Sequence, residues 1–480
     1  MAEPQSPAQQ RDLRGLCLFG GPALALVAWV AVSPAGVGWL GLSAEGAATL
    51  AILVWMACWW LTEPVDLAVT ALLPALLLPI VGAAKSAEAL APYANDVIFL
   101  FGGGCAMAIA IERHGLAQRL TRLVLHATGT RPHRIVLGLL ATSVCVSAWV
   151  SNTATTAMLL PIGLGLIAAA EPLIDSPLAK RQFAAAALLA IAYGSSIGGV
   201  ATILGSPPNP IASEWLMANG VQMEFWQWAR FGVPTALAMA VAAAVIFRWS
   251  FPMRGVGSVE LPIPVAAVPE PLSRAGWMTL AVFVLAVSLW CFSPLLKPLI
   301  PSLSDGRVAL AAAFILMVLP SGASDKAPVL PWSETKRLPW GVFVLGGGGL
   351  SLAEAMERTG VSAGIAAHLG DVSFVPALVI LAAVVLTMVL ASEIASNTAL
   401  TATAVPIIGA IAPSLGIPVE KAVIGTALGA SLAFIMPVGT PPNALVYATG
   451  RVASRDMIRT GVALDIASMV IVTLICWLLV

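Results

Sequence analysis

Apolar residues dominate this chain in long runs, not in the half-apolar patterns that soluble helices show. About 20 apolar residues are needed to cross a bilayer as a helix. Eleven runs have roughly this size, and we expect them to span a membrane: 15–33, 46–61, 65–83, 96–111, 183–204, 230–249, 275–296, 306–320, 340–356, 422–447 and 461–480. The pattern therefore predicts an all-α polytopic membrane protein.

Two further apolar blocks, 133–170 and 374–413, are too long for a single span. Each is interrupted by a Ser-Asn-Thr triplet, which leaves two arms of about 15–18 residues, short for a full crossing. We predict that each block is a re-entrant hairpin that enters the membrane and returns. Irregular backbone at that depth is tolerated only where protein or a water-filled cavity covers it.

The triplets belong to an internal repeat. Ser151-Asn152-Thr153 returns 245 positions later as Ser396-Asn397-Thr398. The same shift aligns other positions of the two halves: Gly102–Gly104 with Gly347–Gly349, Glu112-Arg113 with Glu357-Arg358, Ser147 with Ser392, and Pro161 with Pro406. Self-similarity of this kind is the first feature to establish in a sequence, because it decides the architecture.

A second motif follows each triplet. Gly205-Ser206-Pro207-Pro208-Asn209 corresponds to Gly439-Thr440-Pro441-Pro442-Asn443, at a shift of 234. Proline lacks a backbone N–H and its ring clashes with the preceding turn, at a cost of about 3 kcal/mol in a helix interior. We therefore expect broken helices at 183–217 and 422–447. The carbonyl groups that such breaks release need partners, and a cation is one.

Charge places the two halves relative to the membrane. If the N-terminus is cytoplasmic, 18 of the 24 Lys and Arg residues fall on the cytoplasmic side, as the positive-inside rule requires, and the C-terminus lies outside. The first hairpin then enters from the cytoplasm and the second from outside, so the repeats are inverted. The predicted organisation is a tail with a first span (1–45), repeat 1 (46–250), a cytoplasmic linker (251–273) and repeat 2 (274–480). Residues 112–134 are expected to form an interfacial amphipathic helix.

Composition excludes several classes of function. The chain is 59% hydrophobic and 10% charged, and its net charge of zero gives no indication of nucleic-acid binding. Six cysteines without a Cys-x-x-Cys pair, and four histidines at unrelated spacings, indicate neither disulfides nor a metal centre. A membrane enzyme would need a nucleophile–base pair or a metal cluster at depth, and the sequence offers neither.

The polar groups of the hairpins and breaks suit an anion held together with cations. Ser, Asn and Thr side chains and freed backbone groups provide oxygens for a bare Na⁺ and donors for a carboxylate. No Lys, Arg or His lies in 141–170, 191–213, 391–413 or 425–450. Broken helices in an inverted repeat are typical of a secondary transporter's binding site. The single acid in these segments is Glu393, whose counterpart is Ala148; a structural hydrogen-bonding role and a coupling role are both open.

Several motifs resemble those of the divalent anion/sodium symporters: Trp59–Glu63, both Ser-Asn-Thr triplets, and Ala430–Gly439 with Asn443–Val446. The resemblance covers about residues 45–460. It implies sodium-driven uptake of dicarboxylates, tricarboxylates or sulfate by a homodimer that works as an elevator in the cell membrane. Na⁺ is then the coupling ion, with no covalent cofactor.

The resemblance also implies site residues. One sodium site maps onto Ser147, Ser151, Asn152 and Gly205. The other maps onto Ser392, Ala395, Asn397 and Gly439. The substrate carboxylates would meet Asn152, Thr153, Asn397 and Thr398, flanked by Ser206, Pro207, Thr440 and Pro441. Ser206 departs from the family, which usually carries Thr there, and this leaves the size of the substrate open.

The leading hypothesis is thus Na⁺-coupled symport of a dicarboxylate such as succinate, malate or fumarate. The alternatives within the same fold are a sodium-independent anion exchanger and a sulfate or tricarboxylate transporter. An exchanger would be expected to carry a fixed cation where Na⁺ binds, and none is present at the hairpin tips. A channel is less consistent with broken helices that close on a compact polar site.

Overall fold

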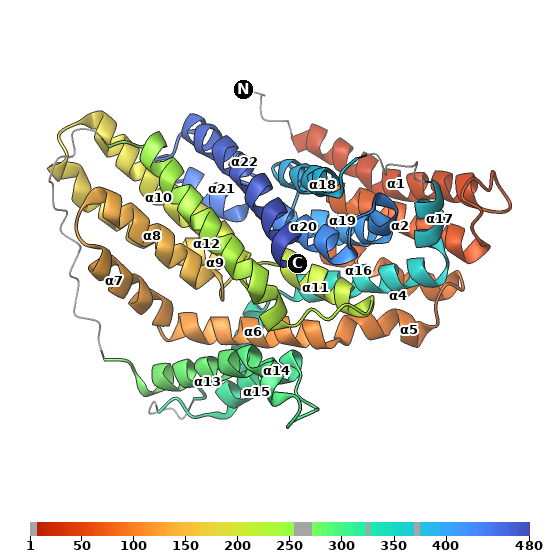
Figure 1. Ribbon diagram of the computed structural model, residues 1–480, viewed down its shortest axis with the longest axis horizontal. Helices are drawn as coiled ribbons and strands as arrows, with labels where there is room; N and C mark the ends of the chain where they lie inside the picture. Colours follow the sequence, from red (N-terminus) through yellow and green to blue (C-terminus); the bar gives the residue numbers. More distant parts are fainter. Residues whose placement is uncertain (1–6, 254–270, 323–326, 369–374) are drawn as a thin grey trace.

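The structure, a computed structural model, describes residues 7–253, 271–322, 327–368 and 375–480. Helices account for all regular structure within these ranges, apart from one isolated bridge between Pro320 and Pro328. Figure 1 shows them as an elongated bundle. The predicted all-α fold is confirmed.

The helices of the first half begin and end as follows: α1 (Pro7–Val32), α2 (Ala44–Thr62), α3 (Leu67–Thr70), α4 (Leu73–Ile80), α5 (Ser86–Leu90), α6 (Asp96–Arg113), α7 (Leu116–Thr128), α8 (Pro132–Ser147), α9 (Asn152–Ala170), α10 (Pro177–Gly199), α11 (Pro208–Ala218) and α12 (Phe225–Ser250). Those of the second half are α13 (Arg274–Cys291), α14 (Ser293–Leu296), α15 (Asp305–Val318), α16 (Trp340–Arg358), α17 (Val361–His368), α18 (Ala377–Ser392), α19 (Asn397–Ile411), α20 (Val419–Ser431), α21 (Pro441–Tyr447) and α22 (Ser454–Leu479). Four short 3₁₀ helices are η1 (Ala91–Ala94), η2 (Glu171–Leu173), η3 (Trp332–Arg337) and η4 (Ala412–Leu415).

Nine helices in the described part of the chain are long and apolar enough to cross a membrane. They include α9 and α19, each extended by its 3₁₀ turn, which the sequence assigned to hairpin arms. Several of the eleven predicted spans are shorter than expected. The span predicted at 65–83 is divided between α3 and α4, and the one predicted at 422–447 is interrupted after α20, which has 13 residues. Many large apolar side chains on the outer helices are exposed, as a lipid-facing surface requires.

The repeat in the sequence is a repeat of helices. From α6 to α12 and from α16 to α22, the elements follow in the same order, and the outer members match in length: α8 and α18 have 16 residues each, α12 and α22 have 26 each. The amphipathic segment 112–134 contains α7, whose second-half counterpart is α17. The predicted linker 251–273 falls mostly outside the described residues.

Each hairpin is held against its broken helix by glycines. On α10, a Cβ at Gly194 would lie 2.7 Å from the Ser143 Cβ of α8. On α20, a Cβ at Gly429 would lie 3.1 Å from the Val385 carbonyl of α18. Glycine at these positions lets the backbones approach closely, the usual means of helix packing in membranes. The two units therefore share one local design.

The helix breaks precede the Pro-Pro pairs. Between α10 and α11 the backbone is irregular over 200–207, and between α20 and α21 over 432–440. Pro208 opens α11, and Pro441 and Pro442 open α21. Proline is well tolerated in the first turn of a helix, where its missing N–H has no partner to lose. The second half-helices thus begin within these pairs, at the second proline in repeat 1 and at the first in repeat 2, and the preceding residues form the irregular segments.

Candidate functional site

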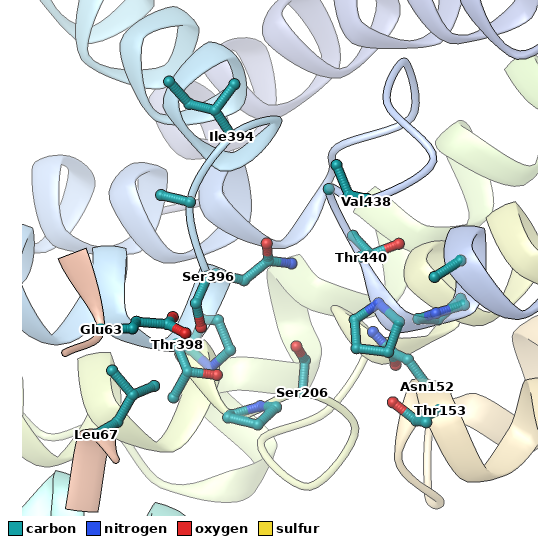
Figure 2. A pocket seen from close by; sticks show the side chains of 18 of the residues that line it. Glu63, Leu67, Asn152, Thr153, Ser206, Ile394, Ser396, Thr398, Val438 and Thr440 are labelled. Carbon is teal, nitrogen blue, oxygen red and sulfur yellow. The ribbon is translucent and has the colours of Figure 1, made fainter. Parts of the chain in front are cut away.

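Both hairpin tips and both breaks face one cavity of about 860 Å³. In Figure 2, Ser396 and Thr398 of the second tip lie on one side, Asn152 and Thr153 of the first tip on the other, and Ser206 between them. The residues that line it are Leu61, Thr62, Glu63, Leu67, Ser151, Asn152, Thr153, Ser206, Pro207, Pro208, Ile394, Ala395, Ser396, Asn397, Thr398, Val438, Gly439, Thr440, Pro441, Pro442 and Ala444. This volume is typical of a small-molecule site.

The structure brings the predicted site residues together. Every predicted substrate residue lines the cavity: Asn152, Thr153, Ser206, Pro207, Asn397, Thr398, Thr440 and Pro441. Of the predicted sodium-site residues, the lining includes Ser151, Asn152, Ala395, Asn397 and Gly439. The other three do not line it, and two of them, Ser147 and Ser392, are fully buried serines at the ends of α8 and α18.

At the first tip, oxygen atoms gather around Asn152. Ser147 donates a hydrogen bond to the Asn152 Oδ1 at 2.8 Å. The side-chain atom at this position also lies 3.0 Å from the Ser195 carbonyl oxygen and 3.2 Å from the Gly205 carbonyl oxygen, both of which are acceptors. Either the amide turns and donates to these oxygens, or a cation lies among them. Gly199 packs directly against the Asn152 amide, so a side chain there would displace it.

The second tip repeats part of this arrangement. Ser392 donates to the Asn397 Oδ1 at 2.6 Å and also contacts the Ala430 carbonyl at 2.5 Å. Asn397 opens α19 as Asn152 opens α9, so the helix start fixes where each amide lies. The pairing of a buried serine with the triplet asparagine is therefore common to both tips.

Asn209 and Asn443 brace the irregular segments. The Asn209 amide donates to the Gly199 and Thr202 carbonyls, both at 2.7 Å. The Asn443 amide donates to the Ala433 carbonyl at 3.4 Å and the Met436 carbonyl at 3.1 Å. Both side chains are fully buried and neither lines the cavity. Their role in the structure is to satisfy backbone groups that the breaks release.

Helix ends supply the positive potential of the cavity. Within the described chain, no Lys, Arg or His lines it. The helices α9, α11 and α19 begin at its wall, and helix N-termini carry about half a positive charge with free N–H groups. The acidic residue in the lining is Glu63, which ends α2 with a left-handed backbone (φ 45°).

Some lining residues were not predicted as site residues. The α2–α3 corner, which is distant in sequence from both duplicated motifs, contributes Leu61, Thr62, Glu63 and Leu67. The signal that was available is the Trp59–Glu63 segment, noted as a family motif but given no place at the site. The described residues hold no group of three or more His, Cys, Asp or Glu side chains that suits a metal ion.

Glu393, whose role the sequence left open, is a hydrogen-bond acceptor behind the second tip. Its Oε1 accepts the N–H groups of Phe434 and Ile435 at 2.7 and 2.9 Å, and its Oε2 accepts that of Met436 at 2.6 Å. These three residues belong to the irregular segment between α20 and α21. The predicted structural role is therefore present, and it leaves a coupling role open.

Comparisons with known proteins agree with one another. Residues 22–480 match the family described as "Sodium:sulfate symporter transmembrane region". The sodium-dependent dicarboxylate transporter SdcS of Staphylococcus saprophyticus is 33% identical over 453 residues, which cover 92% of this chain and 87% of the relative. SdcS of Staphylococcus aureus (strain bovine RF122) is 30% identical over an alignment 490 positions long, which covers 99% of this chain and 92% of the relative.

A solved structure supports the fold. The crystal structure of the YdaH transporter of Alcanivorax borkumensis superposes with a TM-score of 0.52 and 16% sequence identity. The match covers 84% of this chain and 87% of that one. At this identity the likeness concerns the arrangement of helices.

Proposed function

The chain belongs to the divalent anion/sodium symporter family, and from this premise we propose that it carries a dicarboxylate into the cell together with Na⁺. It is an integral membrane protein of a transporter family. One observation carries the proposal: two Ser-Asn-Thr tips face a single cavity whose described lining has no basic side chain. A dianion in such a cavity requires mobile cations beside it.

Two sodium ions fit the clusters at the tips. The first would lie among Ser147, Ser151, Asn152 and Gly205, where the Asn152 amide group meets the Ser147 hydroxyl and the Ser195 and Gly205 carbonyls. The second would lie among Ser392, Ala395, Asn397 and Gly439, behind the Ser392–Asn397 contact. Neutral oxygen ligands of this kind suit a hard monovalent cation better than a transition metal.

The anion would bind between the tips. In this proposal the amides of Asn152 and Asn397 donate to its two carboxylates, and Thr153 and Thr398 add hydroxyl donors. Ser206, Pro207, Thr440 and Pro441 close the site from the sides of the breaks. The starts of α9 and α19 favour negative charge at the same place.

The proposal extends to how the protein moves. With a cytoplasmic N-terminus and an external C-terminus the repeats are inverted, and α8–α12 and α18–α22 travel as one body against α1–α6 and α13–α16 in a homodimer. A buried bond supports the single body: Tyr193 of α10 donates to the Phe434 carbonyl, in the break of the other repeat, at 2.7 Å. A crosslink between α19 of the moving body and α2 of the scaffold, which are in contact, should stop transport, and unchanged transport would contradict the elevator.

The deciding experiment is uptake of labelled succinate into proteoliposomes, with Na⁺ replaced by choline or Li⁺. Sodium-driven symport predicts accumulation that requires a Na⁺ gradient, and succinate affinity that rises with Na⁺ by reciprocal linkage. If more than two Na⁺ accompany each dianion, each further charge contributes about 2.3 kcal/mol per 100 mV of membrane potential. Sodium-independent succinate binding in calorimetry would contradict the proposal and indicate an exchanger.

A further inference from the structure

Two acidic side chains lie buried together behind the second hairpin tip. Glu393 follows the last residue of α18, and Asp465 lies on α22. They are 5% and 4% exposed, and the Asp465 side chain lies directly beside that of Glu393. Burial of two like charges side by side is costly unless something compensates for them.

The two carboxylates differ in their partners. Glu393 accepts the N–H groups of Phe434, Ile435 and Met436, so its charge is well satisfied. Among the described residues, neither oxygen of Asp465 makes a well-formed hydrogen bond, and its polar neighbours include the Glu393 carboxylate and the Phe434 N–H, which already donates to Glu393. A buried carboxylate without a well-formed hydrogen bond requires an explanation in a native structure, and binding of a cation is one.

Basic side chains on the surrounding helices are engaged or exposed elsewhere. α22 packs against α12, α18 and α20, and α10 lies behind them. Arg230 of α12 donates to the Leu479 carbonyl, Lys421 of α20 to the Trp477 carbonyl, and Arg181 of α10 to Asp456. The remaining basic groups on these helices do not neutralise the pair, because Arg248, Arg455 and Arg459 are exposed and Lys180 lies at the start of α10. The Tyr193 hydroxyl donates to the Phe434 carbonyl.

The other repeat shows that this unit folds without the pair. Glu393 corresponds to Ala148 at the shift of 245. When α12 and α22, which have 26 residues each, are aligned from their first residues, Ala236 corresponds to Asp465. The same alignment matches Gly232 with Gly461, and each of these glycines packs against the backbone of its own break. Both acids are thus an addition to repeat 2, at two positions that meet in space.

We propose that Asp465 and Glu393 form a third cation site, for Na⁺, in addition to the two at the tips. Asp465 supplies its two carboxylate oxygens and the full charge that the ion balances, while Glu393 remains held by the backbone N–H groups. The proposal rests on the sodium coupling proposed above.

The site is connected to the second tip. A Cβ on Gly439 would lie 3.2 Å from the Glu393 carbonyl oxygen and 3.2 Å from its Oε2. An ion at Asp465 therefore stabilises the segment 432–440 that carries Gly439. Because Asp465 is buried on the proposed moving body, this ion would cross the membrane with the substrate.

The test is a count of bound Na⁺ on the purified protein in detergent, by titration with ²²Na⁺ and no substrate present. Asp465→Asn keeps the shape and removes the charge, and it should lower the count by one. The matched control is Asp456→Asn, the same change in the first turn of the same helix, where the half-buried carboxylate pairs with Arg181 at 3.0 Å. The control should keep the wild-type count. In proteoliposomes the ratio of Na⁺ to succinate transported should also fall by one in Asp465→Asn.

An Asp465→Asn protein with the wild-type sodium count overturns the proposal, including the case in which a proton occupies the site instead. If this variant does not accumulate, Asp465→Ala gives the position the residue that repeat 1 carries at Ala236, removes the charge and leaves the hydrogen bonds of Glu393 in place, and it should also bind one Na⁺ fewer. If neither variant accumulates, the wild-type count decides, because two ions per chain contradict a third site. Sodium binding without substrate separates this outcome from failure of dicarboxylate transport.

Discussion

The two repeats build the same site with different means of holding their breaks. In repeat 1 the irregular segment is tied by neutral groups: Thr202 donates to the Ala148 carbonyl, and Trp228 donates to the Val200 carbonyl at 3.1 Å. In repeat 2 the corresponding segment donates three N–H groups to the carboxylate of Glu393. Hydrogen bonds to a charged acceptor are stronger than neutral ones.

This difference separates what transport requires from what each half adds. The elements common to both repeats are the buried serine, the triplet asparagine, the glycine of the break and the bracing asparagine. Of these shared elements, the triplet asparagines and Gly439 line the cavity, and the buried serines contact the triplet asparagines. The elements that differ lie behind the second tip, and they place negative charge in one half alone. The predictions below ask which shared elements are equivalent in practice.

The largest effect is expected at the triplet asparagines. Asn152 and Asn397 should each serve a Na⁺ through the side-chain oxygen and the substrate through the NH₂ group. Replacement of either by Ala leaves both partners unsatisfied, at about 1–3 kcal/mol each and more for charged ones. Succinate uptake should fall by roughly a hundredfold or more in both variants. Unequal losses would show that the repeats contribute unequally.

Aspartate at the same positions sharpens this test. Asn152→Asp or Asn397→Asp keeps an oxygen, removes both donors and adds a negative charge beside the dianion. Uptake should be lost, while Na⁺ binding by titration is kept or strengthened. Asn219→Ala, at the exposed end of α11, is the matched control and should keep wild-type uptake. Near wild-type uptake in Asn152→Ala or Asn397→Ala would refute the site assignment.

The next largest effect is expected at Gly205 and Gly439, the glycines of the two helix breaks, and it should differ between them. A Cβ on Gly205 would lie 2.5 Å from the Gly199 carbonyl and 2.8 Å from the Ser147 carbonyl, both rigid backbone. A Cβ on Gly439 has 3.2 Å to its nearest neighbours. Overpacking costs about 1–3 kcal/mol. Gly205→Ala should therefore raise the Na⁺ concentration for half-maximal uptake by about tenfold or more, and Gly439→Ala by a few-fold. The reverse order would contradict the close approach at the first tip.

A smaller difference is expected between the bracing asparagines. Asn209 makes two hydrogen bonds at 2.7 Å, whereas those of Asn443 are 3.1 and 3.4 Å long. Asn209→Ala should lower stability by about 1–3 kcal/mol, and Asn443→Ala by less. Thermal unfolding in detergent measures the order. Substrate affinity in the folded fraction should change little in both, because neither side chain lines the cavity.

Much of this candidate site could be predicted from the sequence because its two motifs, Ser-Asn-Thr and Gly-x-Pro-Pro-Asn, each occur twice. The duplicated triplets and Pro-Pro motifs indicated which segments would face a common cavity, the family resemblance supplied the individual residues, and apolar runs of sufficient length indicated the helical class. The predicted extents were less accurate at the breaks, since the Pro-Pro pairs open α11 and α21 and the irregular backbone precedes them. Proline constrains the residues before it as strongly as it disrupts a helix.

What could not be predicted depends on contacts between distant segments. Glu63 reaches the cavity from the α2–α3 corner, which carries neither of the duplicated motifs. Asp465 lies in an apolar span where nothing in the local sequence points to Glu393, 72 positions earlier. The internal repeat reveals positions that correspond between the halves. Glu393 and Asp465 occur in one half alone, so their proximity is seen only in the folded structure.

The smallest effect is expected at Ser206, where the repeats differ by one methyl group at the cavity wall. Ser206→Thr makes the position equal to Thr440 and keeps the hydroxyl, which lies 3.5 Å from that of Ser431. One methyl group in a hydrophobic pocket is worth about 1–3 kcal/mol, and it should be worth less beside an open cavity of about 860 Å³. We expect a two- to fivefold shift in preference toward the smaller of succinate and citrate, measured as competition in sodium-driven uptake. Thr440→Ser is the reciprocal variant and should shift preference toward the larger anion. If both variants shift preference in the same direction, the substrate does not contact the two breaks as equivalent walls, and the symmetry of the site ends at the hairpin tips.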